Sequence, residues 1–264
     1  MFVDGLVVMI VGAGPGLGAT LARRCANDGA DLVLAARTTG TLEQIAADVR
    51  AHGRRVLARA TDVSDRDQVR ALADAALAEF GRVDVLVNAA FPPAPGGPVV
   101  DMDDDAMDAW RRSVDAGAYG TLLTCRFVAP SMIAAGKGSI VNVTSMTSRL
   151  AHGGRSDYAA GKAAMHRLGW ALADELGPHG IRVNAVAPDA VTTGGDEHAR
   201  EEMLAAGAIY EPIYSPPLGY FAHPEECASV VLFLASDLSK FVTGVTIQVD
   251  GGNGAAGGWR SIGQ

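Results

Sequence analysis

The sequence predicts an α/β fold in which a doubly wound, parallel sheet of seven strands carries helices on both faces. Short apolar runs alternate with longer amphipathic stretches along the chain, which is typical of strands and helices joined by right-handed crossovers. Several apolar runs are nearly continuous, as in strands that are covered on both faces. A glycine-rich stretch directly follows the first run and precedes the first amphipathic one, as in a tight strand-turn-helix unit.

The expected elements follow one another in strict order. Strands are predicted at residues 6–11, 31–36, 55–60, 83–87, 138–144, 181–185 and 245–249. Between them, apolar side chains at helical spacing predict helices at 16–28, 41–52, 64–80, 103–135, 158–176 and 224–235. Carboxylates mark two helix starts, at Asp65 and in the acidic run 103–105. Because a helix dipole stabilises acidic side chains at its N-terminus, we interpret the acidic run as a helix start rather than a metal site.

The chain is predicted to form one domain, 1–264, because no repeat, linker or shift in composition divides it. Two segments fall outside the alternation, the Pro- and Gly-rich residues 91–100 and the tyrosine-containing residues 192–222. Loops at the carboxyl ends of parallel strands bind ligands in this architecture, so 192–222 is the expected substrate lid. A short Gly-rich C-terminal tail, 253–264, follows the last strand.

Charge and cysteine usage exclude several partners. The 22 Lys and Arg residues against 30 Asp and Glu give a net charge of -8, the wrong sign for binding nucleic acid or an anionic membrane. Cys25, Cys125 and Cys227 lie far apart without metal-ligand spacing, and the histidines show none either. The first residues lack a basic segment, and their apolar run is too short to span a bilayer. We expect a cytoplasmic protein without a metal site.

The glycine-rich stretch predicts a dinucleotide site. It contains Gly12, Gly14, Gly16, Leu17 and Gly18. Glycines at these positions allow a tight turn, let backbone N–H groups approach a pyrophosphate and let the helix pack close to the strand. Such a turn alone is weak evidence, but its place between a strand and a helix is typical of a Rossmann fold.

The end of the second predicted strand indicates which dinucleotide binds. An acidic residue there would bind the ribose 2′-hydroxyl, but residues 34–40 contain none. Arg37 instead offers a guanidinium that suits a 2′-phosphate. This favours NADP(H) and leaves NAD(H) as the alternative, with Arg37 then a solvated surface charge.

Ser145, Tyr158 and Lys162 are the predicted catalytic residues. Tyr158 and Lys162 are one helical turn apart, so both side chains project from the same face. An ammonium beside a phenol favours the phenolate, which predicts a lowered pKa for Tyr158 and proton exchange with an alcohol or ketone oxygen. Ser145, on the loop after the fifth predicted strand, can donate a hydrogen bond to that oxygen.

Together these motifs resemble the compact type of the short-chain dehydrogenase/reductase family over nearly the whole chain. The resemblance implies that Tyr158 is the general acid/base, Ser145 orients the carbonyl and Lys162 binds the nicotinamide ribose. It also implies a homotetramer formed through the helices at 103–135 and 158–176. Further cofactor contacts are implied at Asp62, Val63, Asn88, Ala89, Ala90, Tyr158, Pro188, Val191 and Thr193.

Two departures from the family pattern concern the reaction centre. Aligned through the residues around Gly120, the fourth helix places Gly117 where the family keeps a catalytic asparagine that helps hold a water of the proton relay. Phe91 stands where the family usually has a glycine, and we expect its ring to face the cofactor ribose or the substrate.

The expected function is an NAD(P)(H)-dependent oxidoreductase that interconverts a secondary alcohol and a ketone. Apolar side chains in 192–222 indicate a lipophilic substrate, such as a 3-oxoacyl, steroid or terpenoid compound, although they would equally pack a lid or a subunit interface. The alternative is a cofactor-binding sensor or structural relative with weak or lost turnover, because Gly117 lacks the asparagine side chain. A nucleotide-sugar epimerase is disfavoured because little chain follows the last strand.

Overall fold

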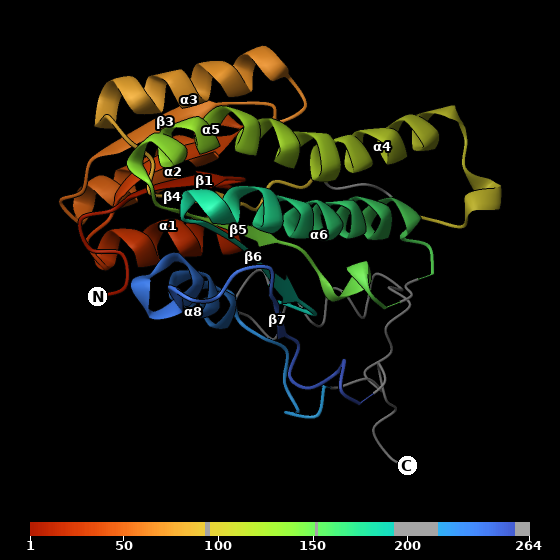
Figure 1. The fold of residues 1–264 in the computed structure, drawn as a ribbon. Helices are drawn as coiled ribbons and strands as arrows, with labels where there is room; N and C mark the ends of the chain where they lie inside the picture. The colour runs from red at the N-terminus through yellow and green to blue at the C-terminus, as the bar shows by residue number, and fades with distance from the viewer. Residues whose placement is uncertain (93–95, 151–152, 193–215, 257–264) are drawn as a thin grey trace.

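The computed structural model describes residues 1–92, 96–150, 153–192 and 216–256. Seven parallel strands form one sheet in the order β3-β2-β1-β4-β5-β6-β7 (Figure 1). The strands are β1 Val7–Val11, β2 Asp31–Ala36, β3 Val56–Ala60, β4 Val85–Asn88, β5 Gly138–Val143, β6 Ile181–Pro188 and β7 Thr246–Val249. The order of the strands changes direction between β1 and β4. In this fold, a ligand is expected to bind in a crevice at the carboxyl ends of the two strands where the order changes.

The predicted Rossmann fold is confirmed, with element ends shifted by a few residues. The helices are α1 Leu17–Asn27, α2 Thr39–Ala51, α3 Arg66–Phe80, α4 Asp104–Asp115, α5 Thr121–Ala135, α6 Ser156–Leu176 and α8 Pro224–Ala235. Figure 1 shows α3, α5 and α6 on one side of the sheet and α1 and α8 on the other. Each face of the sheet therefore has its own hydrophobic core.

Alternate residues of one strand supply these two cores. In β1, Val8 and Ile10 pack with α1, α2 and α8, whereas Val7, Met9 and Val11 pack with α3, α5 and α6. All five side chains are at least 95% buried. Full burial of one such side chain stabilises the fold by roughly 1.5–3 kcal/mol, so the central strands must be apolar on both faces.

The predicted helix at 103–135 is not continuous. A π-helical turn at Ala116–Gly120 separates α4 from α5. A π-helical turn takes one more residue per hydrogen-bonded turn than an α-helix, and it is often found at functional sites. The apolar pattern did not predict this interruption. The helix before it, α4, lies mainly against α6, whereas α5 lies mainly against α3.

The interpretation of the acidic residues as helix starts is confirmed. Asp65 accepts hydrogen bonds from the backbone N–H groups of Asp67 and Gln68 at the start of α3. Asp103 accepts one from Ala106 at the start of α4. Among the described residues, no cluster of His, Cys, Asp or Glu could hold a metal ion.

Cys25, Cys125 and Cys227 are buried and unpaired, and burial raises the pKa of each thiol to about 12. They therefore behave as small apolar side chains rather than reactive thiols. In the described part of the chain, the structure contains no helix with the length and hydropathy needed to span a bilayer.

Most of the predicted lid, 192–222, lies outside the described residues, as does Thr193. The described ends of this segment meet, because Val191 and Ala222 form a β-bridge and the Thr192 N–H donates to the Ala222 carbonyl at 2.9 Å. The first part of the predicted tail is packed rather than free. Asn253 is 1% exposed, and its side-chain Nδ2 donates to Asp189 Oδ2 at 2.6 Å.

Candidate active site

The glycine-rich turn after β1 is shaped by close backbone contacts. Gly12 has φ +102°, and a Cβ there would lie 2.4 Å from the Ala90 nitrogen. A Cβ on Gly18 would lie 2.4 Å from the Gly12 carbonyl oxygen. Since the Ala89 N–H also donates to the Val11 carbonyl at 2.7 Å, the turn lies directly against the end of β4. Gly12 and Gly18 therefore bring β1, α1 and β4 close together.

The other glycines of this turn leave an open, polar surface. A Cβ on Gly14 would meet nothing within 4 Å. Gly16 precedes α1 with φ +82°, and no side chain caps the helix that begins at Leu17. The first N–H groups of a helix attract anions, and they are most available where no side chain caps them. Open space beside an uncapped helix start fits the pyrophosphate of a dinucleotide.

Arg37 lies where an adenosine ribose is expected in this fold. It follows β2, is exposed, and makes no hydrogen bond or ion pair within the described part of the chain. Asp62 follows β3, and its Oδ1 accepts from the N–H and Oγ of Ser64 at 2.9 and 2.6 Å. Val63 is 91% buried and packs against Gly120 of the π-helical turn. Asp62 and Val63 thus shape the loop, and their contact with a cofactor stays a prediction.

The side chain of Asn88 belongs to a buried network. Its Nδ2 donates to Asn142 Oδ1 at 2.9 Å, and its Oδ1 accepts from Thr124 Oγ1 at 2.7 Å. These bonds connect β4 with β5 and α5 and satisfy the amide, which would be costly to bury unpaired. Asn88 therefore holds the loop of Ala89 and Ala90 in place, and its contact with a cofactor stays a prediction.

The structure brings Ser145, Tyr158 and Lys162 together. Ser145 follows β5 and forms a side-chain hydrogen bond with Tyr158 near the start of α6. The Nζ of Lys162 lies 5.7 Å from the centre of the Tyr158 ring. Lys162 is 3% exposed and donates to the Val143 carbonyl at 2.6 Å, a contact that the sequence did not predict. The last residue of β5 thus orients the lysine.

Burial has the largest effect on the pKa values of Tyr158 and Lys162. It raises the pKa of Tyr158, an effect that the hydrogen bond from Ser145 and the charge of Arg155 oppose. Burial also lowers the pKa of Lys162 to about 7. The predicted lowering of the Tyr158 pKa was therefore wrong for this structure, because loss of hydration disfavours both the phenolate and the ammonium.

The depressed pKa of Lys162 predicts a pH-dependent stability. Between pH 7 and the usual lysine value, the unfolded chain binds a proton that the folded chain does not, so the free energy of unfolding rises with pH. From pH 7 to 9, we expect the free energy of unfolding of wild type to rise by about 2 kcal/mol more than that of Lys162→Met. Urea unfolding at both pH values measures this difference. An exposed-site control, Lys137→Met, should follow wild type, and identical slopes for all three proteins would contradict the assignment.

Phe91 packs directly on the candidate catalytic pair. Its ring meets that of Tyr158 edge-on, with centres 4.8 Å apart, and Lys162 Nζ lies 4.9 Å from its centre. A Cβ on Gly161 would lie 2.8 Å from Phe91 Cε2, so this glycine makes room for the ring. Phe91 therefore helps to hold Tyr158 and Lys162, and the face of Lys162 that it covers is closed to water.

Gly117 lies against the backbone of α6. A Cβ at this position would be 2.7 Å from the Gly161 carbonyl oxygen and 3.0 Å from the Gly161 Cα. No side chain fits there without moving α6, which carries Tyr158 and Lys162. The structure thus shows a close helix contact at the position where the sequence indicated only a missing side chain.

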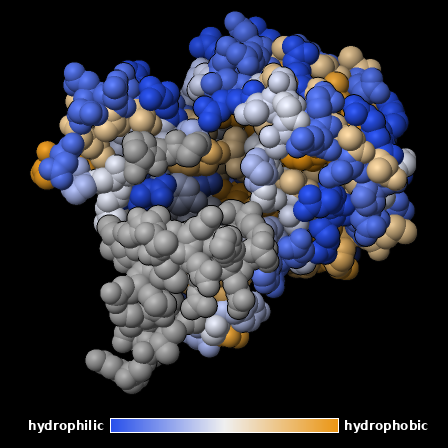
Figure 2. Space-filling view, turned by 180° about the vertical axis from the view of Figure 1, so that it is seen from behind, coloured by the Kyte–Doolittle hydropathy of each residue, from blue (hydrophilic) through white to orange (hydrophobic). Residues whose placement is uncertain are grey.

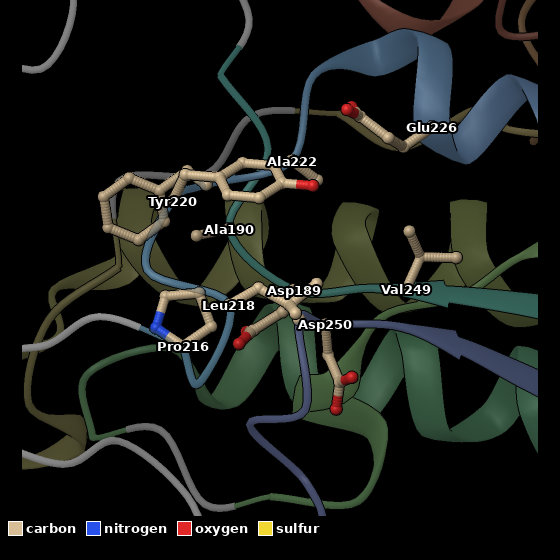
Figure 3. A pocket seen from close by; sticks show the side chains of 11 residues that line it. Asp189, Ala190, Pro216, Leu218, Tyr220, Ala222, Glu226, Val249 and Asp250 are labelled. Carbon is tan, nitrogen blue, oxygen red and sulfur yellow. The ribbon is translucent and has the colours of Figure 1, made fainter.

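A small cavity of about 70 Å³ lies beyond the carboxyl ends of β6 and β7. Figure 3 shows residues that line it, among them Asp189 and Asp250 at these strand ends and Leu218 and Tyr220 on the segment before α8. Burial raises the pKa of Asp189, although its hydrogen bond with Asn253 opposes this. Pro188 ends β6 immediately before the cavity. The cavity therefore continues the edge of the sheet at which the catalytic candidates lie.

The surface around this edge is hollowed. Figure 2 shows a recess near the centre of the face seen from behind, with hydrophobic side chains in it and hydrophilic ones over much of the surrounding surface. An apolar recess with a few polar groups is the usual form of a small-molecule site.

Comparisons with known proteins show what this chain is similar to. Residues 12–253 match the family described as enoyl-(acyl carrier protein) reductase. The cis-4-hydroxycyclohexanecarboxylate dehydrogenase of Sinomonas cyclohexanicum is 39% identical over 246 residues, which are 93% of this chain and 95% of that protein. The 3-oxoacyl-[acyl-carrier-protein] reductase of Thermotoga maritima is 34% identical over 252 residues, 96% of this chain and 99% of that protein.

A similar solved structure is that of carveol dehydrogenase from Mycobacterium avium in complex with NAD. It superposes with a TM-score of 0.83 at 29% identity, covering 94% of this chain and 97% of that one. The likeness extends over the whole sheet and its helices rather than over one motif.

Proposed function

This chain belongs to the short-chain dehydrogenase/reductase family of NAD(P)-dependent oxidoreductases, and from that premise we propose that it interconverts a secondary alcohol and a ketone through Tyr158. The convergence of Ser145, Tyr158 and Lys162 at the end of β5 and the start of α6 carries the proposal. When bound, a nicotinamide dinucleotide supplies the centre that accepts or donates a hydride.

The side chains then have distinct roles. Tyr158 exchanges a proton with the substrate oxygen, and Ser145 donates a hydrogen bond that holds the same oxygen. Lys162 uses one of its three donors on the Val143 carbonyl, which leaves two for the ribose hydroxyls. Backbone N–H groups at the start of α1 hold the pyrophosphate. Gly14, whose own N–H donates to the Gly12 carbonyl at 2.8 Å, leaves the space beside them free of a side chain.

The substrate is proposed to be lipophilic and ring-bearing. The Sinomonas relative is named for a hydroxycyclohexane compound, and the Thermotoga relative for a 3-oxoacyl group. The hydrophobic recess next to the strand ends supports an apolar body in the substrate. Steroid and terpenoid ketones belong to the same class and should be tested with it.

A turnover screen tests the proposed reaction. Cyclic and acyclic ketones and alcohols are supplied with NADPH, NADH, NADP⁺ or NAD⁺, and cofactor absorbance is followed. For any ketone that reacts, cofactor deuterated at nicotinamide C4 should deliver deuterium to the carbinol carbon of the product. Tight cofactor binding without turnover of any compound would instead favour the alternative function, a cofactor-binding sensor. That alternative rests on Gly117, which lacks the asparagine side chain usual in the family.

NADP(H) is the proposed cofactor, because Arg37 is exposed at the end of β2 and has no partner among the described residues. Replacing Arg37 with alanine should weaken NADPH binding about 10-fold or more, since a charge-assisted bond to the 2′-phosphate is lost. NADH affinity should change less than twofold. Fluorescence titration with both cofactors measures the two values, and unchanged NADPH affinity would rule out this role for Arg37.

We also propose that the chain acts as a single-domain homotetramer in the cytoplasm. Exposed apolar side chains on the π-helical turn, α5 and α6 support an interface along these elements. They are Tyr119, Leu122, Ile133 and Trp170, each 36–44% exposed. Light scattering of the purified protein gives the mass that decides between tetramer and smaller states.

A further inference from the structure

Arg155 places a positive charge beside the candidate reaction centre. It directly precedes α6, three residues before Tyr158. Its guanidinium carbon lies 5.1 Å from the centre of the Tyr158 ring. The side chain is 38% exposed, so the charge is within reach of a molecule that binds at Tyr158.

The stem of this arginine is held, whereas its donors are largely unused. A Cβ on Gly96 would lie 2.9 Å from Arg155 Cδ, and the Gly97 N–H donates to the Gly154 carbonyl at 2.7 Å. The loop at 96–97 therefore packs on the aliphatic part of the side chain. Nε is buried without a hydrogen bond, and no described residue accepts one from the two Nη groups.

Other arginines of the chain show what a structural role looks like here. Arg182 donates to the carbonyls of Leu234 and Ser236 and to a serine hydroxyl. Arg55 donates to the carbonyl and the carboxylate of Glu79. In the described part of the chain, Arg155 has no comparable set of acceptors, although a guanidinium carries five N–H donors.

Among the described residues, the ion-pair partner of Arg155 is Asp157, whose carboxylate is itself without a hydrogen bond. Asp157 is 2% exposed, and neither of its carboxylate oxygens accepts a hydrogen bond. Its Oδ1 lies 3.8 Å from Arg155 Nε, an ion pair without the geometry of a hydrogen bond. Asp157 therefore keeps the guanidinium near Tyr158 and leaves the Nη edge for another acceptor.

We propose that Arg155 binds a carboxylate of the substrate, so that the enzyme acts on a hydroxy acid and its oxo acid. This inference rests on the reaction proposed above and adds the substrate class. A planar guanidinium matches a carboxylate by two parallel hydrogen bonds, which an amide or ester cannot replace. One small molecule can then place its carbinol at Tyr158 and its carboxylate at Arg155, with a short apolar spacer between them.

Binding of unreactive probes tests the contact without turnover. Cyclohexanecarboxylate and the neutral cyclohexanecarboxamide are titrated by calorimetry into protein saturated with NADPH. We expect the carboxylate to bind at least about 10-fold more tightly, and Arg155→Gln to remove this preference with amide affinity unchanged. Arg149→Gln, which removes an exposed arginine of the same loop, should keep the preference.

Two further variants separate recognition from folding. Arg155→Gln leaves the buried Asp157 charge unpaired, so Arg155→Gln combined with Asp157→Asn provides a neutral background and should lose the preference equally. Asp157→Asn alone should keep the preference or increase it. Equal affinity of wild type for both probes, or a preference that survives in the double variant, would overturn the proposal, as would weaker NADPH binding in Arg155→Gln.

Turnover gives the second readout. Wild type should reduce 4-oxocyclohexanecarboxylate with a kcat/KM about 10-fold above that of its methyl ester, with the difference in KM, and Arg155→Gln should equalise the two. Reduction of the ester at the same efficiency as the acid would refute the carboxylate contact and leave the reaction intact. Probe preference without turnover of any ketone would refute the reaction and leave the contact intact.

Discussion

Replacing Tyr158 with phenylalanine is expected to lower kcat about 10³-fold while NADPH affinity stays within about twofold. The variant loses only the hydroxyl that bonds with Ser145 and that we propose to exchange a proton with the substrate oxygen. The ring remains, and with it the edge contact with Phe91 and the position under Arg155. The variant should therefore fold as wild type does and have a slower chemical step.

Steady-state kinetics on the best substrate of the screen measures this effect, with cofactor titration as the binding control. Tyr119→Phe is a matched variant, because this tyrosine lies on the π-helical turn and its hydroxyl contacts only Arg66 among the described residues. Its kcat should stay within twofold of wild type. A Tyr158→Phe protein with more than a tenth of wild-type activity would exclude Tyr158 as the main proton carrier.

Gly117→Asn is expected to destabilise the protein by about 1–3 kcal/mol and to lower kcat, although it restores the residue usual in the family. Its Cβ would lie 2.7 Å from the Gly161 carbonyl oxygen, which is backbone and cannot rotate away. The added side chain must push α6 from the π-helical turn. Since α6 carries Tyr158 and Lys162, the displacement should also disturb their alignment with Ser145.

Urea unfolding at pH 7, together with kcat on the same substrate, measures the two effects. Gly40→Asn is the stability control, since Gly40 is also helical but a Cβ there would meet nothing within 4 Å. It should change the free energy of unfolding by less than about 0.5 kcal/mol. A Gly117→Asn protein of full stability and higher kcat would show instead that the position is open to the family asparagine.

Gly117 also shows where sequence reasoning reached its limit. Alignment of the fourth helix correctly placed Gly117 near the reaction centre, but it described the position as an absent side chain. In the structure, Gly117 and Gly161 let two helices touch by their backbones, and Gly161 in turn admits the ring of Phe91. The two departures from the family pattern, Gly117 and Phe91, thus belong to one packing arrangement around Gly161.

The same limit applies to charges. Spacing placed Tyr158 and Lys162 on one helix face and predicted an ammonium that lowers the pKa of the phenol. The structure buries both groups, so the loss of hydration, rather than the distance between them, has the largest effect on their pKa values. The Val143 carbonyl that holds Lys162 has no sequence signal, because any residue at that position offers the same oxygen.

By itself, the sequence determined the class of the fold and the strand-turn-helix unit after β1, and it predicted the side chains that we propose to be reactive. These features depend on periodicity and short spacing, which are local properties of the chain. Only the tertiary structure decided that Gly117 lies on Gly161, that Asn88 belongs to a buried network and that Arg155 faces Tyr158 with unused donors. Such contacts join elements that are distant in the chain or depend on how loops pack, and burial then sets the energy of each polar group.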